Sequence, residues 1–400
     1  MSELSVADFR NRARTWLEQN APRRGGDDEP GRAEIATQKA FQAKLYDAGF
    51  AGLTWPKEYG GQGLTNAEQI AFTQAARDFA LPVGAFVIGL GMPGPTILEL
   101  GSEEQKKRYL PRLLRGEEIW CQLFSEPSGG SDVAALITTA VRDGDAWVLN
   151  GQKVWTSGAQ YSDYGAVIAR TDPTVPKHNG ITMFIVDMHA PGVTVRPLKV
   201  ATGATPFNEV FFDQVRLPAD SVIGEVNDGW HAAVVMLRNE RVAIGTMAAP
   251  RTSPLSYHSL SGLAGRLGRA DGGLRRKLAE LYARERSVRL FGQLLREEAM
   301  AGRDPGPRGS VAKLAGAELG VFASLVAADV LGPAAAGSDS ADVRAVLNAM
   351  ISAPGGSIAG GTNEIQRNII GERVLGLPKD PGVDRSTPFN QLRVGTLPKN

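Results

Sequence analysis

The sequence predicts an α+β protein in which helical segments flank a central block of strands. Residues 1–118, and those from Trp230 onward, space their apolar side chains as amphipathic helices do. Between them, short β-branched and aromatic runs alternate with Gly, Pro and Asp, which is typical of a compact, largely antiparallel β domain. This segregation of helices and strands along the chain favours the α+β class.

Length and composition indicate a soluble, cytoplasmic protein of two or three domains. The 44 Lys and Arg nearly balance the 43 Asp and Glu, which argues against a nucleic-acid or membrane-surface binder. The first twenty residues lack the apolar segment of a signal peptide, and no run approaches the roughly 20 apolar residues that span a bilayer. Cys121 is the only cysteine, so no internal disulfide is possible, and we interpret it as a small buried hydrophobe. No metal site is expected.

Residues 1–118 are predicted to form an N-terminal helical domain, with helices at Ala67–Ala80 and Glu103–Leu114. Gly89–Gly94 fits the G-x-G-x-x-G pattern of dinucleotide-binding loops. A dinucleotide site needs a strand before this pattern and a helix after it, but here helical patterns flank it and Pro93 interrupts it. A Rossmann site is therefore not expected.

Residues 119–226 are predicted to form the β domain. Within Ala146–Thr156, Asn150-Gly151 separates two apolar runs, which predicts a hairpin that turns at these two residues. Further strands are expected at Ala166–Arg170, Ile181–Val186, Val193–Leu198 and Glu209–Phe212.

Residues 227–379 are predicted to be helical again, and 380–400, with three prolines, to form an extended tail. The expected helices are His231–Met247, Leu274–Ala299, Ser310–Leu331 and Ser340–Ile351.

The most informative stretch is Cys121–Asp132, which reads CQLFSEPSGGSD. Its Gly, Pro and Ser residues allow tight backbone turns and expose N–H and hydroxyl donors, which suits an acceptor-rich cofactor. Trp155 and Ser157 follow in a predicted strand and share one face of it, while Thr156 points the other way. An indole and a hydroxyl on one face can stack beside a flat ring and donate to it. The alternative is a core Trp with an edge Ser.

Together these two motifs resemble the flavin-binding signature of the acyl-CoA dehydrogenase family, in which a Ser/Thr-Glu-Pro-x-x-Gly-Ser-Asp loop precedes a Trp-x-Ser/Thr strand. Three more blocks resemble the family: Trp55–Gly61, Phe207–Asp213 and Gly361–Arg367. The resemblance covers most of the chain. It implies an N-terminal helical domain, a middle antiparallel β domain, a C-terminal four-helix bundle and FAD as cofactor.

The resemblance also implies which residues contact the flavin. In the loop these are Gln122, Phe124, Ser125, Gly130 and Ser131, with Ser131 also a candidate contact for the acyl-CoA. Trp155 would pack against the flavin ring and Ser157 would bond near its N5, while Glu126-Pro127 would mainly shape the turn.

Near the C-terminus, Thr362 and Glu364 match residues that contact the flavin diphosphate or ribose, usually from a neighbouring subunit. This implies an oligomer. Gln366-Arg367 is interpreted as ordinary helix surface. The family's Arg-x-x-Phe-Gly block, which grips the pyrophosphate, is missing here, and Arg266 is the remaining candidate for that role.

The reaction of this family needs a desolvated carboxylate aimed at the α-carbon of a thioester. Family members usually take it from a C-terminal Tyr-Glu-Gly-Thr, but this chain has Ala359-Gly360-Gly361-Thr362, with Gly360 at the carboxylate's position. Isovaleryl- and long-chain-type members instead carry the base on a bundle helix just before an Arg. At that place this chain has Glu240-Arg241. The N–H of Gly360 remains available, and in the family this amide helps to bind the thioester oxygen.

Helical periodicity singles out Glu240 independently of the resemblance. Apolar residues lie one and two turns away on both sides: Ala233, Met236, Leu237, Ala243, Ile244 and Met247. A carboxylate in such a stripe is costly to bury, which favours a functional role. The alternative is a partly buried Glu in an ion pair with an Arg of another helix.

The resemblance therefore implies an acyl-CoA dehydrogenase. Glu240 would remove the α-proton of an acyl-CoA, and the β-hydrogen would leave as hydride to flavin N5 to give a trans-2-enoyl-CoA. An electron-transfer flavoprotein would reoxidise the flavin, and a homodimer or homotetramer is expected. Three alternatives stay open: an acyl-CoA oxidase, a flavin monooxygenase, and a non-catalytic subunit of a heterotetramer. Short branched, long-chain and steroid side-chain CoA esters all fit as substrates.

Overall fold

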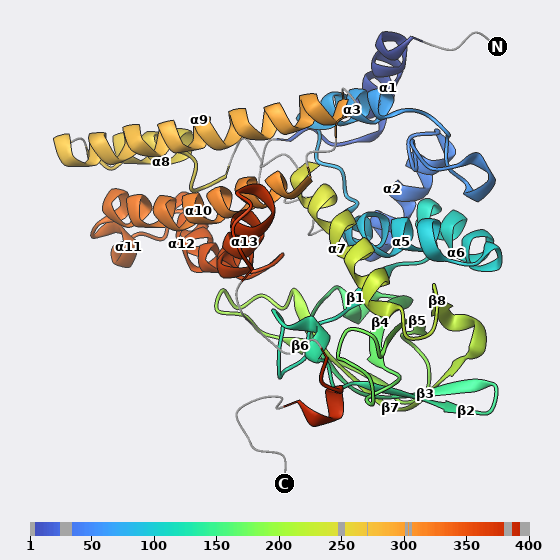
Figure 1. Cartoon of the computed structure of the whole chain (residues 1–400). Helices are drawn as coiled ribbons and strands as arrows, with labels where there is room; N and C mark the ends of the chain where they lie inside the picture. Colours follow the sequence, from blue (N-terminus) through green and yellow to red (C-terminus); the bar gives the residue numbers. More distant parts are fainter. Residues whose placement is uncertain are drawn as a thin grey trace. The chain divides into compact units, whose positions relative to one another are not determined.

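The computed structural model describes residues 5–24, 34–246, 253–269, 271–300, 303, 306–379 and 386–392. Helices precede and follow the strands along the chain, which confirms the predicted α+β class (Figure 1). The chain divides into two compact units: 1–198, 205–240 and 384–400 form unit 1, and 199–204 with 241–383 form unit 2. The predicted helix end at Met247 and most of the predicted tail lie outside the described residues.

The N-terminal part of unit 1 is helical, as predicted. Its α-helices are α1 (Val6–Asn20), α2 (Ile35–Asp47), α3 (Asn66–Ala75), α4 (Val87–Gly91), α5 (Pro93–Leu100) and α6 (Glu103–Arg115). Capping boxes begin α3 at Thr65 and α6 at Ser102. The G-x-G-x-x-G segment lies within α4 and α5 and follows a 3₁₀ turn, so it lacks the context of a dinucleotide loop. Its glycines allow close packing instead, since a Cβ on Gly94 would lie 2.5 Å from the Trp55 ring.

The β domain is a single eight-stranded sheet in the order β6-β7-β3-β2-β4-β5-β8, with β1 parallel to β4. Apart from the parallel contacts of β4 with β1 and β2, the pairings are antiparallel. The strands are β1 (Trp120–Leu123), β2 (Thr139–Asp143), β3 (Ala146–Ser157), β4 (Tyr164–Arg170), β5 (Ile181–Asp187), β6 (Val193–Leu198), β7 (Phe207–Pro218) and β8 (Val222–Ile223).

Strands β4 and β5 are buried on both faces. Ala166 and Ile168 of β4 enter a core cluster with residues of α5, α6 and α7 (Gly229–Thr246). Val167 and Ala169, which point the other way, enter a second cluster with residues of β3 and β7. Cys121 belongs to that second cluster and is fully buried, which confirms its interpretation as a small hydrophobe. Burial raises the pKa of its thiol to about 12.

The predicted hairpin turn at Asn150-Gly151 is wrong. Both residues lie inside β3, and the chain turns earlier, at Gly144-Asp145, between the paired residues Asp143 and Ala146. The register of β3 against β7 shifts at Asn150, whose Oδ1 accepts hydrogen bonds from both the backbone and the side chain of Gln214. An Asn-Gly pair supplies turn geometry equally well to such an irregularity within a strand.

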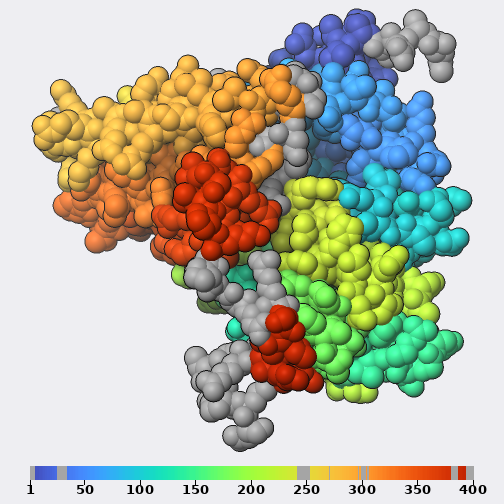
Figure 2. Space-filling model, in the orientation of Figure 1, coloured from blue at the N-terminus to red at the C-terminus, as the bar shows by residue number. Residues whose placement is uncertain are grey.

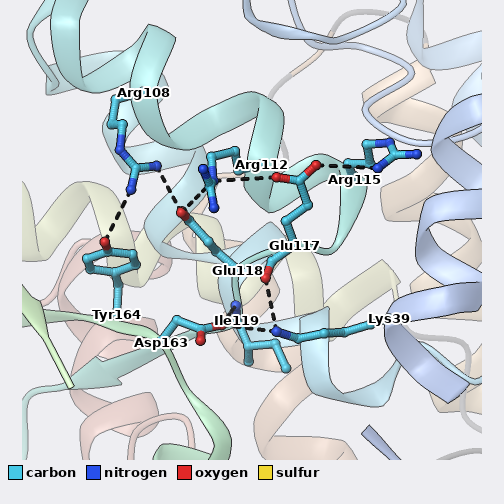
Figure 3. Close-up of polar contacts among 9 residues, drawn as sticks. All are labelled: Lys39, Arg108, Arg112, Arg115, Glu117, Glu118, Ile119, Asp163 and Tyr164. Atoms are coloured by element: carbon cyan, nitrogen blue, oxygen red, sulfur yellow. Dashed lines mark hydrogen bonds and ion pairs between the residues drawn. The ribbon is translucent and has the colours of Figure 1, made fainter. Parts of the chain in front are cut away.

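A polar network joins the N-terminal helices to the start of β1 (Figure 3). Arg108 and Arg112 of α6 both contact the buried carboxylate of Glu118, at 2.8 and 2.6 Å. One residue later, the N–H of Ile119 donates to Asp163 at 2.7 Å. Exposed ion pairs contribute little to stability, but a buried carboxylate with two arginines holds its place firmly. The network therefore fixes where β1, and the loop after it, leave the helical layer.

Unit 2 consists of α8 (Tyr257–Arg266), α9 (Gly272–Met300), α10 (Gly309–Leu331), α11 (Ala334–Gly337), α12 (Ala341–Ser352) and α13 (Asn363–Ile369). Helices α8, α9, α10 and α12 contribute to one apolar core. By length and composition alone, the helix Gly306–Leu331 could cross a membrane, so the expectation that no run approaches this was wrong. The indication is weak because core helices of soluble proteins pass the same test, and Val326, Ala327 and Val330 lie in the core.

Gly151 offers a test of the irregular strand. Its φ is +144°, and a Cβ there would lie 2.5 Å from Oγ1 and 2.7 Å from Cα of Thr138. We expect Gly151→Ala to lower the free energy of unfolding in urea by about 2–3 kcal/mol, because overpacking adds to backbone strain. Gly144→Asn is the control: its φ is +62° with no atom within 4 Å, and Asn tolerates that conformation. Equal losses in the two variants would contradict this account.

Candidate active site

The loop that follows β1 is held along β3. The carbonyl of Ser125 accepts the N–H of Val154 at 2.9 Å, and Glu126 and Gly129 exchange backbone hydrogen bonds across a tight turn. Phe124 is buried, whereas Gly130 and Ser131 are exposed. The loop therefore rests on the strand that carries Trp155 and leaves its tip open.

A buried ion pair anchors this loop, and the sequence did not indicate it. Nζ of Lys153 in β3 lies 2.8 Å from Oε1 of Glu126 and also donates to the carbonyl of Phe124 at 3.1 Å. The Glu126 carboxylate accepts two further hydrogen bonds, from the N–H groups of Ile137 and Thr138. Glu126 thus shapes the turn, as expected, and also ties both ends of the loop to β3. The one available signal was a lysine beside the apolar pair Val154-Trp155 in β3.

Burial would by itself raise the pKa of Glu126. The charge of Lys153 and the hydrogen bonds from Ile137, Lys153 and Thr138 outweigh burial, so the pKa of this carboxyl lies below its usual value. Glu126 is therefore ionised at neutral pH. The pair contributes stability above the unfolded-state pKa of the carboxyl, and this contribution is lost as the pH falls through the folded-state pKa.

Trp155 is presented to solvent by a bulge. From Lys153 to Thr156, β3 carries one more residue than the facing part of β7, and Trp155 has a φ of +61°. Its side chain is 58% exposed and meets the ring of Phe207 edge-on, with centroids 5.8 Å apart. Thr156 is buried, whereas Trp155 is exposed and Ser157 half-buried. This agrees with the prediction that Trp155 and Ser157 share one face of the strand and Thr156 points the other way. The indole therefore presents an open aromatic surface.

Glu240 lies on α7, four residues beyond Met236 and seven beyond Ala233. Both of these residues lie in the core cluster that contains Phe124 of the loop, and Leu237 packs against that cluster. Glu240 itself is half-buried. The side chains of Ala243 and Ile244, and all of Met247, lie outside what the structure describes. The N-terminal half of the predicted apolar stripe is confirmed.

In unit 2, Gly360 and Gly361 form a left-handed turn before α13, with φ of +65° and +86°. The interpretation of Gln366 as helix surface was wrong. Gln366 is buried, and its amide donates to the carbonyls of Gly360 and Gly361 at 3.1 and 3.3 Å. Nζ of Lys313 on α10 also donates to the Gly361 carbonyl, at 2.6 Å. These two side chains, which sequence reasoning missed, fix the backbone at Gly360.

The other predicted residues of unit 2 lie at two places. Thr362 caps α13 and accepts the N–H of Ile365, and the exposed Glu364 lies 3.7 Å from Arg367. The pKa of Glu364 is lowered by hydrogen bonds from its own N–H and from Thr362. Arg266 lies on α8, where its guanidinium pairs with Asp342 of α12 at 2.6 Å. Among the described residues, no group of three or more His, Cys, Asp or Glu is suited to hold a metal.

The Glu126–Lys153 pair generates a pH-dependent test. We expect Lys153→Met to lower the free energy of unfolding at pH 7 by about 3–5 kcal/mol, because it leaves a buried carboxylate without its cation. Burial should then raise the pKa of Glu126. The variant's stability should therefore fall as pH rises through that value, and its deficit against wild type should shrink near pH 4.

Urea unfolding between pH 4 and pH 8 measures both effects. Lys277→Met is the control, since Lys277 forms an exposed pair with Asp329 that is worth about 1 kcal/mol or less. A pH-independent deficit in Lys153→Met would show that the pair is not charged.

Three family models match this chain, one after the other along the sequence. They are the N-terminal domain of acyl-CoA dehydrogenase at residues 6–117, the middle domain at 121–215 and the C-terminal domain at 227–375. Together they cover the helical layer, the sheet and the helices of unit 2.

Relatives and solved structures agree with the family models. Acyl-CoA dehydrogenase FadE34 of Mycobacterium tuberculosis is 41% identical over 87% of this chain, although the match spans only 48% of FadE34. Acyl-CoA dehydrogenase IpdE1 of the same organism is 37% identical over 94% of this chain and 98% of its own.

Two solved structures resemble the fold at 30% identity or more. The Tcur3481-Tcur3483 steroid acyl-CoA dehydrogenase superposes with a TM-score of 0.78 at 30% identity, covering 94% of this chain and 98% of its own. The ChsE4-ChsE5 complex from Mycobacterium tuberculosis gives 0.74 at 32% identity, covering 95% and 99%. This chain belongs to the acyl-CoA dehydrogenase family.

Proposed function

We propose that this acyl-CoA dehydrogenase uses FAD to oxidise an acyl-CoA thioester to the trans-2-enoyl-CoA, with Glu240 as the base that removes the α-proton. One observation carries the assignment of the base. Glu240 continues the face of α7 on which Ala233 and Met236 enter the core cluster that also contains Phe124 of the loop after β1. Glu240 is half-buried at the end of that apolar face, which suits a base that must be partly shielded from water.

The residues around Trp155 fit a flat cofactor with many hydrogen-bond acceptors. The bulge leaves the indole open for stacking, and the exposed loop tip offers Gly130 and Ser131 as donors. We propose that Gln122, Phe124, Ser125 and Ser157 complete the flavin contacts. Bound FAD would accept the hydride that leaves the β-carbon of the substrate.

In unit 2, the glycine turn supports the assignment of the base to Glu240. A φ of +65° at Gly360 is a conformation that a glutamate side chain rarely adopts, so this backbone is poorly suited to carry the base. We propose that the Gly360 N–H instead donates to the thioester oxygen, where it would stabilise enolate charge. Thr362, Glu364 and Arg266 are proposed to contact the diphosphate and ribose of FAD.

Anaerobic titration with a panel of acyl-CoA esters tests the function. The panel should contain short branched, long-chain and steroid side-chain esters, because one structural relative is described as a steroid acyl-CoA dehydrogenase. Bleaching of the oxidised flavin band by one class identifies the substrate. Reoxidation is expected from an electron-transfer flavoprotein in the cytoplasm, whereas fast reoxidation by oxygen with release of peroxide would indicate an acyl-CoA oxidase.

Replacing the proposed base should stop the reaction without releasing FAD. We expect Glu240→Gln to slow flavin bleaching by about 10²–10⁴-fold, the usual contribution of a general base, because the amide cannot accept the α-proton. Stopped-flow absorbance measures the rate. Glu280→Gln, an exposed residue of α9 paired with Arg284, is the control and should react as wild type. Bleaching at an unchanged rate in Glu240→Gln would refute the base assignment.

A second candidate function is that of one subunit in a heteromeric dehydrogenase. It is favoured by the relatives, since one solved structure is a complex of two proteins and FadE34 is about twice as long as its match to this chain. Native mass spectrometry distinguishes a heteromer from a homo-oligomer. It should be recorded for the chain purified alone and for the chain co-expressed with a second dehydrogenase chain. Flavin bound only in the co-expressed complex would favour the heteromer over a homodimer or homotetramer.

A further inference from the structure

The described part of the C-terminal tail, 386–392, packs on the β domain. The N–H of Phe389 donates to the Val175 carbonyl and the N–H of Asn390 to the Pro173 carbonyl, both at 2.9 Å. Pro388 forms a β-bridge with Pro176, and the Phe389 side chain is only 8% exposed. In the space-filling view this segment, in red, lies against the green surface of the β domain (Figure 2). The tail thus covers the connection between β4 and β5.

Phe389 covers the guanidinium of Arg170, the last residue of β4. The Cζ of Arg170 lies 3.8 Å from the centroid of the Phe389 ring, and Arg170 is buried. Its acceptors are backbone carbonyls: Nη1 donates to Lys177 and Nη2 to Ala134, each at 2.6 Å. Burial lowers the pKa of this guanidinium to about 10. The aromatic face therefore supplies negative potential to a cation that has lost water.

Two series of contacts connect the tail to the end of the proposed flavin loop. The first passes through Arg170 to the Ala134 carbonyl, just after the loop. The second passes through the β4–β5 connection, where Nζ of Lys177 lies 2.8 and 2.7 Å from the two carboxylate oxygens of Asp132. Asp132 directly follows Gly130 and Ser131. The segment after the loop is therefore held by Arg170, which Phe389 covers, and by Lys177 of the connection on which the tail docks.

We propose that Phe389 is a positioning residue: by docking on Arg170 it fixes residues 132–138, and through them the loop whose Gly130 and Ser131 meet the flavin. The identity of the ligand rests on the proposed function, but the docking of the tail does not. Removing the ring would leave Arg170 buried with one face open, and the carbonyls of Ala134 and Lys177 would lose their fixed donor.

Four single variants of the full-length chain test this proposal. Phe389→Ala removes the ring, Phe389→Leu keeps an apolar side chain without a π face, and Phe389→Tyr keeps the ring. Gln391→Ala, in the same short helical turn but exposed, is the matched control. The first readout is amide hydrogen exchange over residues 132–138 in the flavin-free protein, and the second is the dissociation constant for added FAD.

We expect Phe389→Ala to speed exchange over 132–138 and to weaken FAD binding, each about tenfold, as the loss of a desolvated cation–π contact implies. Phe389→Leu should resemble Phe389→Ala, while Phe389→Tyr and Gln391→Ala should resemble wild type. Wild-type exchange over 132–138 in Phe389→Ala would overturn the proposal, as would weaker FAD binding without faster exchange there.

The two readouts also separate this proposal from the proposed function. A wild-type protein that binds no FAD would refute the flavin assignment, and the exchange readout would still decide the role of Phe389. If Phe389→Ala does not fold, Phe389→Leu carries the same comparison with a smaller loss of packing.

Discussion

The buried contact between Glu126 and Lys153 is the interaction on which the proposed cofactor site depends. A loop rich in Gly, Ser and Pro has little apolar surface with which to hold itself in place, so its conformation must be set by hydrogen bonds. Here one carboxylate receives an ammonium and two backbone N–H groups, from strand β3 and from the far end of the loop. Burying two charges is costly, and the hydrogen bonds that both groups make offset part of that cost. What the pair provides is a fixed geometry more than net stability.

The same design recurs around the sheet, with buried charged groups at the points where strands become loops. Glu118 stands before β1 with two arginines, and Arg170 ends β4 with backbone carbonyls as acceptors. Each of these groups restricts the conformations of the adjoining loop, because moving the loop would leave a buried charge without its partners. The loops that adjoin β1 and β4 are thus held by buried charged groups. This is what a site that must position a bound ring requires.

The sequence predicted the elements well and their irregular parts poorly. Helices and strands follow apolar periodicity, which is a local property, and most of the predicted spans match those observed. The hairpin turn predicted at Asn150-Gly151 was wrong because the dipeptide favours a backbone conformation that occurs in turns and in strand irregularities alike. Here Gln214 on a neighbouring strand binds Asn150 and keeps the pair inside β3. Gln366, Lys153 and Arg170 could not be assigned from the sequence for a related reason. Their partners are backbone carbonyls or distant side chains, which only the fold brings to them.

The glycine turn at 360–361 bears on where the chain can carry its base. The side chains of Gln366 and Lys313 hold its carbonyls by hydrogen bonds. Gly360 and Gly361 both have positive φ. A turn fixed in this way favours glycine for conformational reasons, independent of any room that glycine leaves for a substrate. A carboxylate base is then better carried by a regular helix, where its side chain projects without backbone strain. Glu240 on α7 satisfies that condition, at the end of an apolar face that packs with the loop of the proposed flavin site.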